Sequence, residues 1–128
     1  MAICVAAVVS TTYAQFGGEA FFAVGGVYED GRMSAGERSF RAVLKRHDPA
    51  RAFESMVHSS STVRQLYSLL GLHLTDRAAF EREYPVFTQR RDPVRTMDGC
   101  SEFHEEVRRV AKQIASGMYD PLIARPPW

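Results

Sequence analysis

The stretch "STVRQLYSLLGLHLTD", residues 61–76, carries the clearest periodic pattern in the chain. Its large apolar residues recur at every third or fourth position, which is the spacing of one face of an α-helix. These residues are Val63, Leu66, Tyr67, Leu70 and Leu74. Leu69 and Leu72 widen the apolar stripe, so the pattern predicts a central helix that is buried on more than one side. A stripe of this kind is far more often core than binding site, and we therefore interpret it as structural.

The same stretch contains one residue that weakens a helix. Gly71 falls in the helix interior, where glycine costs up to about 1 kcal/mol relative to alanine. A helix tolerates this cost when the missing side chain lets a neighbouring element come close. We therefore expect a second helix to approach the chain at Gly71, with a bend in the helix as the alternative.

Capping signals before this stretch predict two further helices. Ser34 begins "SAGE", a capping box in which the serine hydroxyl accepts a hydrogen bond from the third helical amide while Glu37 reaches back. Asp48 and Pro49 form a second start, because an acidic N-cap is followed by a proline whose missing N–H costs nothing at the first helical position. The break between the two helices is short, so we expect them to fold back as an antiparallel pair.

Further elements are predicted after the central helix. Asp76 caps a shorter helix, which should stop before Pro85. Loop signals dominate residues 85–99, where we expect an irregular segment. The last helix is predicted over residues 101–116, followed by a proline-limited, extended tail over residues 118–128.

Short capped helices joined by tight turns predict an all-α fold. We expect a small orthogonal bundle of about five short helices, or the stub of a helical-hairpin solenoid. Residues 15–33 are rich in glycine and aromatic residues, and they predict an irregular N-terminal arm with a short helix or a β-hairpin. The aromatic rings of this arm should pack on the helices. Residues 15–128 are expected to form a single domain, because 128 residues is an ordinary length for one domain.

The composition argues against several classes of function. Hydrophobic residues make up 45% of the chain and charged residues 24%, which is ordinary for a globular protein. The formal net charge of +1 provides no long-range field that would attract nucleic acid, so no nucleic-acid partner is predicted. Two cysteines are too few for a disulfide scaffold, and the glycine pairs do not match a phosphate-binding loop. No cofactor and no metal are predicted.

Residues 1–14, "MAICVAAVVSTTYA", look like the later part of a secretory signal peptide. An apolar run is followed by small residues at Thr12 and Ala14, the −3 and −1 positions for cleavage after Ala14. The run is too short to span a bilayer, so no membrane span is predicted. In the alternative interpretation, this segment is a buried strand or helical turn of the fold. Cleavage would make the protein periplasmic or secreted, whereas a retained segment would make it cytoplasmic.

Three parts of the chain together carry a resemblance, namely "SAGERSFRAVL", "LYSLLGLHLTDRAAFEREYP" and "VRTMDGC". They resemble a set of small proteins of myxobacteria and related bacteria, which share an "LYALLGL"-like helix and a "V-x-T-M-x-G-C" segment. The likeness covers roughly residues 15–117. Proteins of this set usually carry a signal peptide, so the resemblance implies export and a bacterial origin. It implies no activity.

Cys100 and His104, in "DGCSEFHEE", are weak candidates for catalysis or metal binding. If the last helix begins near Cys100, the positive end of its dipole favours the thiolate. His104 would then lie one turn further along the same face, which permits a Cys–His dyad or two metal ligands. The remaining histidines are not at ligand spacing to this pair, and single pairs arise often by chance. We therefore interpret both residues as structural and predict no catalytic residue.

Candidate contacts for a partner lie in the arm and in the loop before the last helix, because loops more often carry recognition. They are Phe21, Phe22, Tyr28, Arg90, Arg91 and Arg95. Our first hypothesis is a non-enzymatic, exported helical domain that binds another protein, by analogy as an immunity protein or an inhibitor. The alternatives are a small enzyme or metal-binding protein centred on Cys100 and His104, and an intracellular adaptor.

Overall fold

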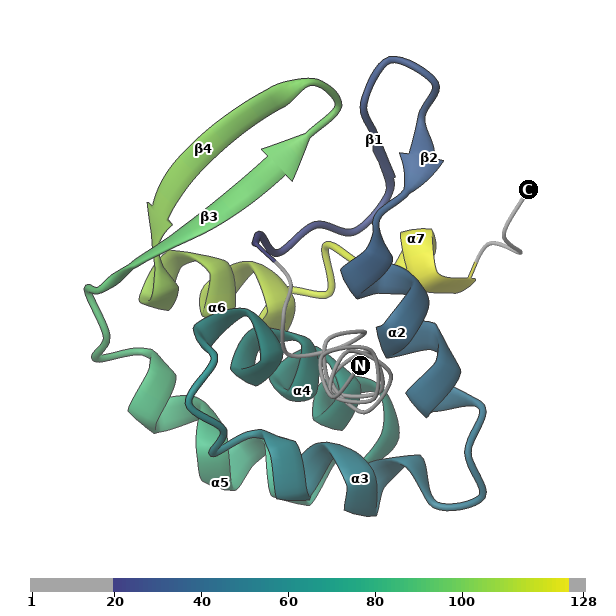
Figure 1. Ribbon diagram of the computed structural model, residues 1–128. Helices are drawn as coiled ribbons and strands as arrows, with labels where there is room; N and C mark the ends of the chain where they lie inside the picture. The colour runs from purple at the N-terminus through teal and green to yellow at the C-terminus, as the bar shows by residue number, and fades with distance from the viewer. Residues whose placement is uncertain (1–19, 125–128) are drawn as a thin grey trace, which may run out of the picture.

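The computed structural model describes residues 20–124, and its helices gather around α4 (Thr62–Thr75) (Figure 1). The other helices are α2 (Ala35–Leu44), α3 (Pro49–Met56), α5 (Arg77–Phe87), α6 (Val107–Ala115) and α7 (Asp120–Ala124). Two antiparallel hairpins stand on one side of these helices: β1 (Gly26–Val27) with β2 (Arg32–Met33), and β3 (Pro93–Asp98) with β4 (Ser101–Glu106). The described part is mostly helical, and the two small sheets make the all-α prediction only roughly right.

Helix α4 is the centre of the core. It packs against α2, α3, α5 and α6. Its buried residues are Val63, Leu66, Tyr67, Ser68, Leu69, Leu70, Gly71, Leu72 and His73. Complete burial of a large apolar side chain contributes about 1.5–3 kcal/mol, so this one helix supplies much of the stability of the fold. The prediction of a central helix buried on more than one side is confirmed.

Gly71 is the point where α3 meets α4. A Cβ atom added at Gly71 would lie 2.4 Å from ring atoms of Phe53, a distance that real Cβ atoms essentially never show. The Phe53 ring therefore fills the space that a side chain at position 71 would need. The expected close approach of a second helix is confirmed, and it explains why a glycine is kept inside the most buried helix.

The predicted helix starts are confirmed by their capping bonds. The Oγ atom of Ser34 accepts from the N–H of Glu37 at 3.1 Å, and Oδ1 of Asp48 accepts from the N–H of Arg51 at 3.3 Å. The second half of the capping box differs from the prediction, because Glu37 is directed to a distant segment. Its Oε1 atom accepts from the N–H of Gly25 in the N-terminal arm at 2.8 Å.

The expected antiparallel pairing of α2 with α3 is wrong. The two helices meet at a steep angle, and α3 lies along α4 (Figure 1). The aromatic rings give the reason, since Phe40 of α2 lies 5.4 Å from Phe53 and 5.7 Å from Tyr67, measured between ring centroids. Both helices bury their apolar faces on the wider stripe of α4, which removes more apolar surface from water than their mutual pairing would.

The prediction that α5 stops before Pro85 is wrong, because the helix continues through Pro85 to Phe87. Phe87 is buried in the core, and the extra turn places it there. Proline removes the hydrogen bond to the carbonyl of Glu81, four residues earlier. Both Glu81 and Pro85 are exposed, so water can satisfy that carbonyl.

The largest correction concerns residues 85–116. The helix predicted over residues 101–116 begins only at Val107, and residues 101–106 form strand β4. Strand β4 pairs with β3, where a loop was expected, in a register that joins Asp98 to Ser101 and Pro93 to Glu106. Gly99 has a φ of +60° at the first of the two turn positions, as a tight type II′ turn requires.

The N-terminal arm forms the expected β-hairpin and packs on the helices through Phe22, which is 1% exposed. The Phe22 ring lies 4.6 Å from the Tyr67 ring, measured between centroids. The N–H of Phe22 donates to the carbonyl of Arg95 at 2.8 Å, and that of Tyr28 donates to the carbonyl of Gly99 at 2.9 Å. The arm therefore runs along the edge of β3 that β4 leaves open.

The predicted extended tail is also wrong between Asp120 and Ala124, where α7 forms. Its "Asp-Pro" start repeats the signal of α3, and Arg41 donates to the carbonyls of Leu122 and Ile123 at its end. Residues 1–14 lie outside the described part, so both interpretations of that segment remain predictions. Among residues 20–124, no helix is long and apolar enough to cross a membrane.

Candidate functional site

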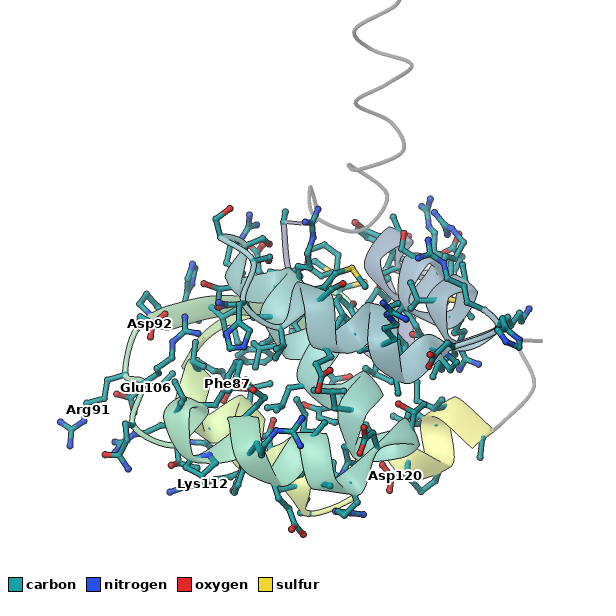
Figure 2. All side chains as sticks on the ribbon, turned by 90° about the horizontal axis from the view of Figure 1, so that it is seen from below. Phe87, Arg91, Asp92, Glu106, Lys112 and Asp120 are labelled. Atoms are coloured by element: carbon teal, nitrogen blue, oxygen red, sulfur yellow. The ribbon has the colours of Figure 1, made fainter. Side chains whose placement is uncertain are left out.

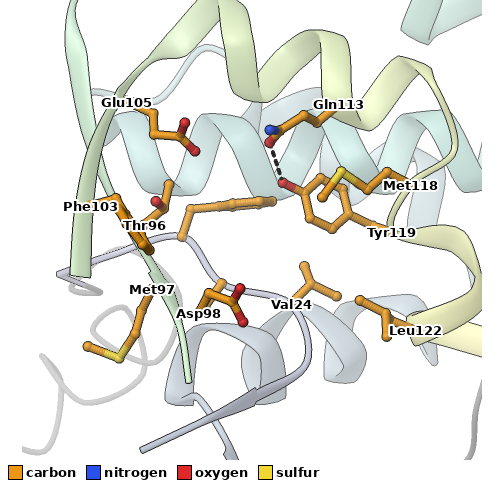
Figure 3. A pocket seen from close by; sticks show the side chains of 12 residues that line it. Val24, Thr96, Met97, Asp98, Phe103, Glu105, Gln113, Met118, Tyr119 and Leu122 are labelled. Atoms are coloured by element: carbon orange, nitrogen blue, oxygen red, sulfur yellow. Dashed lines mark hydrogen bonds between the residues drawn. The ribbon is translucent and has the colours of Figure 1, made fainter. Parts of the chain in front are cut away.

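A groove lies between the β3–β4 hairpin, the N-terminal arm and the turn that joins α6 to α7 (Figure 3). Its volume is about 380 Å³. The lining residues are Thr96, Met97, Asp98, Phe103 and Glu105 of the hairpin, Phe22, Ala23 and Val24 of the arm, and Gln113, Met118, Tyr119 and Leu122 of the C-terminal segment. Three segments that are far apart in the sequence therefore build one site.

Two apolar side chains on the groove are exposed to an unusual extent. Phe103 on β4 is 49% exposed and Met118 after α6 is 56% exposed. Among the described residues, the other large apolar side chains with comparable exposure are Tyr28 and Val86, which line no part of this groove. A concave surface with exposed apolar residues is more often a contact site than scattered apolar residues are.

The floor of the groove belongs to the core and is held firmly. Phe22 and Tyr119 are both buried, and their rings make an edge-to-face contact with centroids 5.6 Å apart. The Tyr67 hydroxyl donates to the carbonyl of Ala23 at 2.7 Å and accepts from the N–H of Ala23 at 3.1 Å. These contacts tie the arm to α4, so the floor keeps its shape without a ligand.

Polar groups at the groove are few and specific. The Tyr119 hydroxyl donates to Oε1 of Gln113 at 2.9 Å, as the dashed line in Figure 3 shows. Burial, with a smaller contribution from the charge of Glu105, raises the pKa of Tyr119 well above its usual range, so the phenol stays neutral. The bond leaves the amide N–H groups of Gln113 without another partner among the described residues. A ligand in the groove thus meets the amide donor of Gln113, the Thr96 hydroxyl and the carboxylates of Asp98 and Glu105. Arg109 pairs with Glu105 at 3.1 Å.

The groove has the chemistry of a binding site. Its lining includes no cysteine, histidine, serine or lysine among the described residues, and no hydrogen bond there pairs the Thr96 hydroxyl with a base. Within residues 20–124, no group of three or more histidine, cysteine, aspartate or glutamate side chains is arranged to hold a metal ion. The surface offers apolar contacts, hydrogen-bonding groups and two carboxylates to a ligand.

Cys100 and His104 do not share a helix face, because the segment that contains them is a turn and a strand. Cys100 is exposed in the turn between β3 and β4, and His104 is exposed on β4 opposite Arg95. Four residues of extended chain separate the two Cα atoms by about 13 Å. The predicted helical geometry of the pair is wrong. The two side chains are therefore not placed on one helix face, as a Cys–His dyad or a shared metal ion would have required.

The six partner-contact candidates fall into two groups, and the first lies on the surface. Phe21 and Tyr28 make an edge-to-face contact at the N-terminal hairpin, with centroids 6.5 Å apart. Tyr28 is 42% exposed and has a φ of +64°, a backbone conformation that is unusual for a tyrosine. Arg95 is exposed and pairs with Glu102 across the hairpin. Figure 2 shows Arg91 extending into solvent.

The second group, Phe22 and Arg90, serves the interior of the fold. Phe22 forms the groove floor and cannot meet a partner as an exposed ring. Arg90 pairs with Asp92 at 2.6 Å, donates to Oε1 of Gln65 at 2.7 Å and lies over the Phe87 ring at 5.5 Å. The Arg90 guanidinium also holds the pKa of Asp92 below its ordinary value. Arg90 thus fastens the start of the β3–β4 hairpin to α4 and α5.

The sequence pattern does not identify Phe103 or Met118 as groove residues. Phe103 falls within the helix predicted over residues 101–116, and Met118 falls within the extended tail predicted over residues 118–128. One signal could have placed Phe103 on a strand, since Asp98-Gly99 after "VRTM" is a typical hairpin turn. Comparison of the chain with protein-family models, curated proteins and solved structures found no match.

Proposed function

We propose that this protein is a non-enzymatic binding domain and that the groove beneath the β3–β4 hairpin receives an apolar segment of another protein. The observation that carries the proposal is the exposure of Phe103 and Met118 on a groove whose floor is part of the core. Both residues remain in water in the free protein, so covering them on binding is favourable by roughly 25 cal/mol per Å² of apolar surface.

The construction of the groove suits protein recognition. Its floor is set by buried rings, so a partner pays little ordering entropy there. Its rim contains the flexible side chain of Met118, which can adapt to the shape of a partner. A volume of about 380 Å³ is near the lower end for ligand sites, which suits a few side chains of a protein segment.

We further propose that the protein is exported and acts as an immunity protein or an inhibitor. Export rests on the signal-like residues 1–14, and the immunity role rests on analogy with other small binding domains. The test is the intact mass of the protein from periplasmic and cytoplasmic fractions, expressed with its native upstream region. A periplasmic chain that begins at Gln15 would support export. A full-length cytoplasmic chain would overturn it and favour the intracellular adaptor.

The groove is tested by site-specific photo-crosslinking in the cells that make the protein. The photo-reactive residue p-benzoylphenylalanine replaces Phe103 in one variant and Val86 in a control, since Val86 is 62% exposed but lies on α5. We expect a discrete adduct with one protein at position 103 and none at position 86. The adduct is identified by mass spectrometry, and its protein is purified.

Binding of that purified protein is then measured for matched variants. We expect Phe103→Ala to raise Kd at least about tenfold, as truncation of an interface hot spot does, and Val86→Ala to change it less than about twofold. Equal adducts at both positions, no adduct at position 103, or an unchanged Kd for Phe103→Ala would each overturn the groove as the contact site.

A further inference from the structure

The α2–α3 corner, defined here as residues 38–51, concentrates positive charge on the surface. Its exposed cations are Arg38, Lys45, Arg46 and Arg51. None of the four forms an ion pair within the described part of the chain, where every ion pair involves other residues. The only carboxylate of the corner is Asp48, which caps α3. His47 beside it is exposed as well.

Helix geometry brings these charges together. Arg38, Arg41 and Lys45 follow the i, i+3, i+7 spacing, so they lie along one face of α2 over about 10 Å. Arg41 is neutralised by the buried carboxylate of Glu37 at 2.9 Å, which leaves its neighbours as the free charges of the face. Arg46 and Arg51 extend the positive surface around the turn into α3.

Helix stability does not explain all of these cations. Lys45 and Arg46 follow α2, where positive charge interacts favourably with the negative end of the helix dipole. Arg51 is different, because it lies in the first turn of α3, near the positive end of that dipole. A cation at this place weakens the helix and repels the other cations of the corner. An external negative charge bound there would offset this cost.

We propose that the α2–α3 corner binds an acidic surface of another protein. Three of its four free cations are arginines, whose planar guanidinium groups bind carboxylates through two parallel hydrogen bonds. The exposed residues of the corner include no phenylalanine, tyrosine or tryptophan ring for stacking on nucleic-acid bases. They also include no large apolar side chain for insertion into a membrane, since Phe40 and Val43 are buried.

Asp48 supports the choice of partner. Its carboxylate stands among the cations and would repel the evenly charged backbone of a nucleic acid. A protein surface carries separate carboxylates, which can contact the arginines on either side of Asp48. The corner lies at the far end of the molecule from the β3–β4 hairpin (Figure 1), so this proposal does not depend on the groove.

The experiment uses poly-L-glutamate as the probe and measures its Kd for the full chain at low and at physiological salt. We expect binding that weakens as salt rises, because the contact is electrostatic. Arg46→Glu with Arg51→Glu should raise Kd at least about tenfold. The control is Arg91→Glu with Lys112→Glu, which changes net charge equally at two exposed cations outside the corner and should raise Kd less than about twofold.

Folding of each variant is checked by circular dichroism. If the charge-reversal variant of Arg46 and Arg51 does not fold, the milder pair Arg46→Gln with Arg51→Gln is used in its place. Equal weakening in the corner and control variants would overturn the proposal, because net charge alone would then explain binding. Absence of poly-L-glutamate binding at low salt would overturn it as well. So would binding that is confined to duplex DNA or to vesicles of phosphatidylserine, each measured with the same variants.

Discussion

In the helical half of the molecule, α2, α3, α5 and α6 surround α4 with large apolar side chains, and Leu66, Leu69 and Leu70 are completely buried. In the hairpin half, β4 has no buried residue and β3 has only Val94. Ladder hydrogen bonds and ion pairs hold the β3–β4 hairpin, whereas the N-terminal hairpin buries Val27 and Met33. Buried apolar side chains are thus concentrated in the helical half, while the hairpin half exposes the large apolar side chains of Tyr28 and Phe103.

The largest expected effect tests the helical half. Phe53→Ala removes a ring that is completely buried and fills the space beside Gly71, so we expect a loss of about 3–5 kcal/mol in the free energy of unfolding. Urea denaturation measures it, with the exposed Val86→Ala as a control that should stay within about 0.5 kcal/mol. A loss below about 1 kcal/mol would contradict the view that the helical half carries most of the stability.

The second prediction concerns the same contact from the other side. Gly71→Ala places a Cβ atom where the Phe53 ring lies, so we expect a destabilisation of about 1–3 kcal/mol from overpacking. In the Phe53→Ala background the clash is absent, and the same substitution should cost little. A double-mutant cycle measures this coupling, and additive effects would show that the ring is not the obstacle.

The third prediction tests how the arm is attached. Tyr67→Phe removes the hydroxyl that bonds both backbone groups of Ala23, which is 3% exposed, so we expect a loss of about 1–3 kcal/mol. Amide hydrogen exchange should accelerate in the arm and β3 more than in α4. Uniform acceleration across the protein would mean that the two halves open together, which would contradict a difference in stability between them.

The fourth prediction concerns the base of the hairpin at low pH. The Arg90 side chain lowers the pKa of Asp92 from its ordinary 3.8, so the folded state favours the carboxylate. This stabilisation is present above the ordinary pKa and is lost as pH falls through the lowered one. Asp92→Asn should remove this dependence and cost less than about 1 kcal/mol at neutral pH, because the pair is partly exposed. The measurement is the unfolding midpoint of both proteins across the acidic pH range. If the pH dependence of stability were the same in Asp92→Asn, the role of Asp92 would be contradicted.

The smallest effect is expected at the hairpin turn. Cys100→Ala changes an exposed residue, so stability should stay within about 0.5 kcal/mol. Partner affinity, measured with the protein identified by crosslinking, should not change if the protein is a binding domain. Loss of a measurable activity in Cys100→Ala, with the fold intact, would instead favour the small thiol-dependent enzyme.

The helices could be predicted because their signals are local. Each of four helices begins with a side chain that accepts a hydrogen bond from the amide three residues later, at Ser34, Asp48, Ser61 and Asp76. The start of a helix therefore depends on a few adjacent residues. The apolar stripe of α4 is equally local, since it requires only the helical period. Gly71 was predictable for the same reason, because an interior glycine demands a close neighbour.

The hairpin and the groove could not be predicted with the same means. Phe103, Val107 and Val110 fit a helical spacing, although the first of them lies on a strand. The choice was made by the turn at Gly99 and by the pairing of β4 with β3, which buries Val94 and lets the arm join the sheet. The local pattern was thus overruled by pairing between segments.

By itself, the sequence determined which residues form α2, α3 and α4, because caps and apolar periodicity act over a few residues. Only the tertiary structure decided that Phe22 is the ring of the arm that lies in the core, that Glu37 bonds Gly25, and that Phe103 and Met118 line one groove. Tyr67 and Ala23, for example, bond across 44 positions of the chain. Contacts of that range depend on how all the buried surfaces fit together, and no short pattern of residues records that fit.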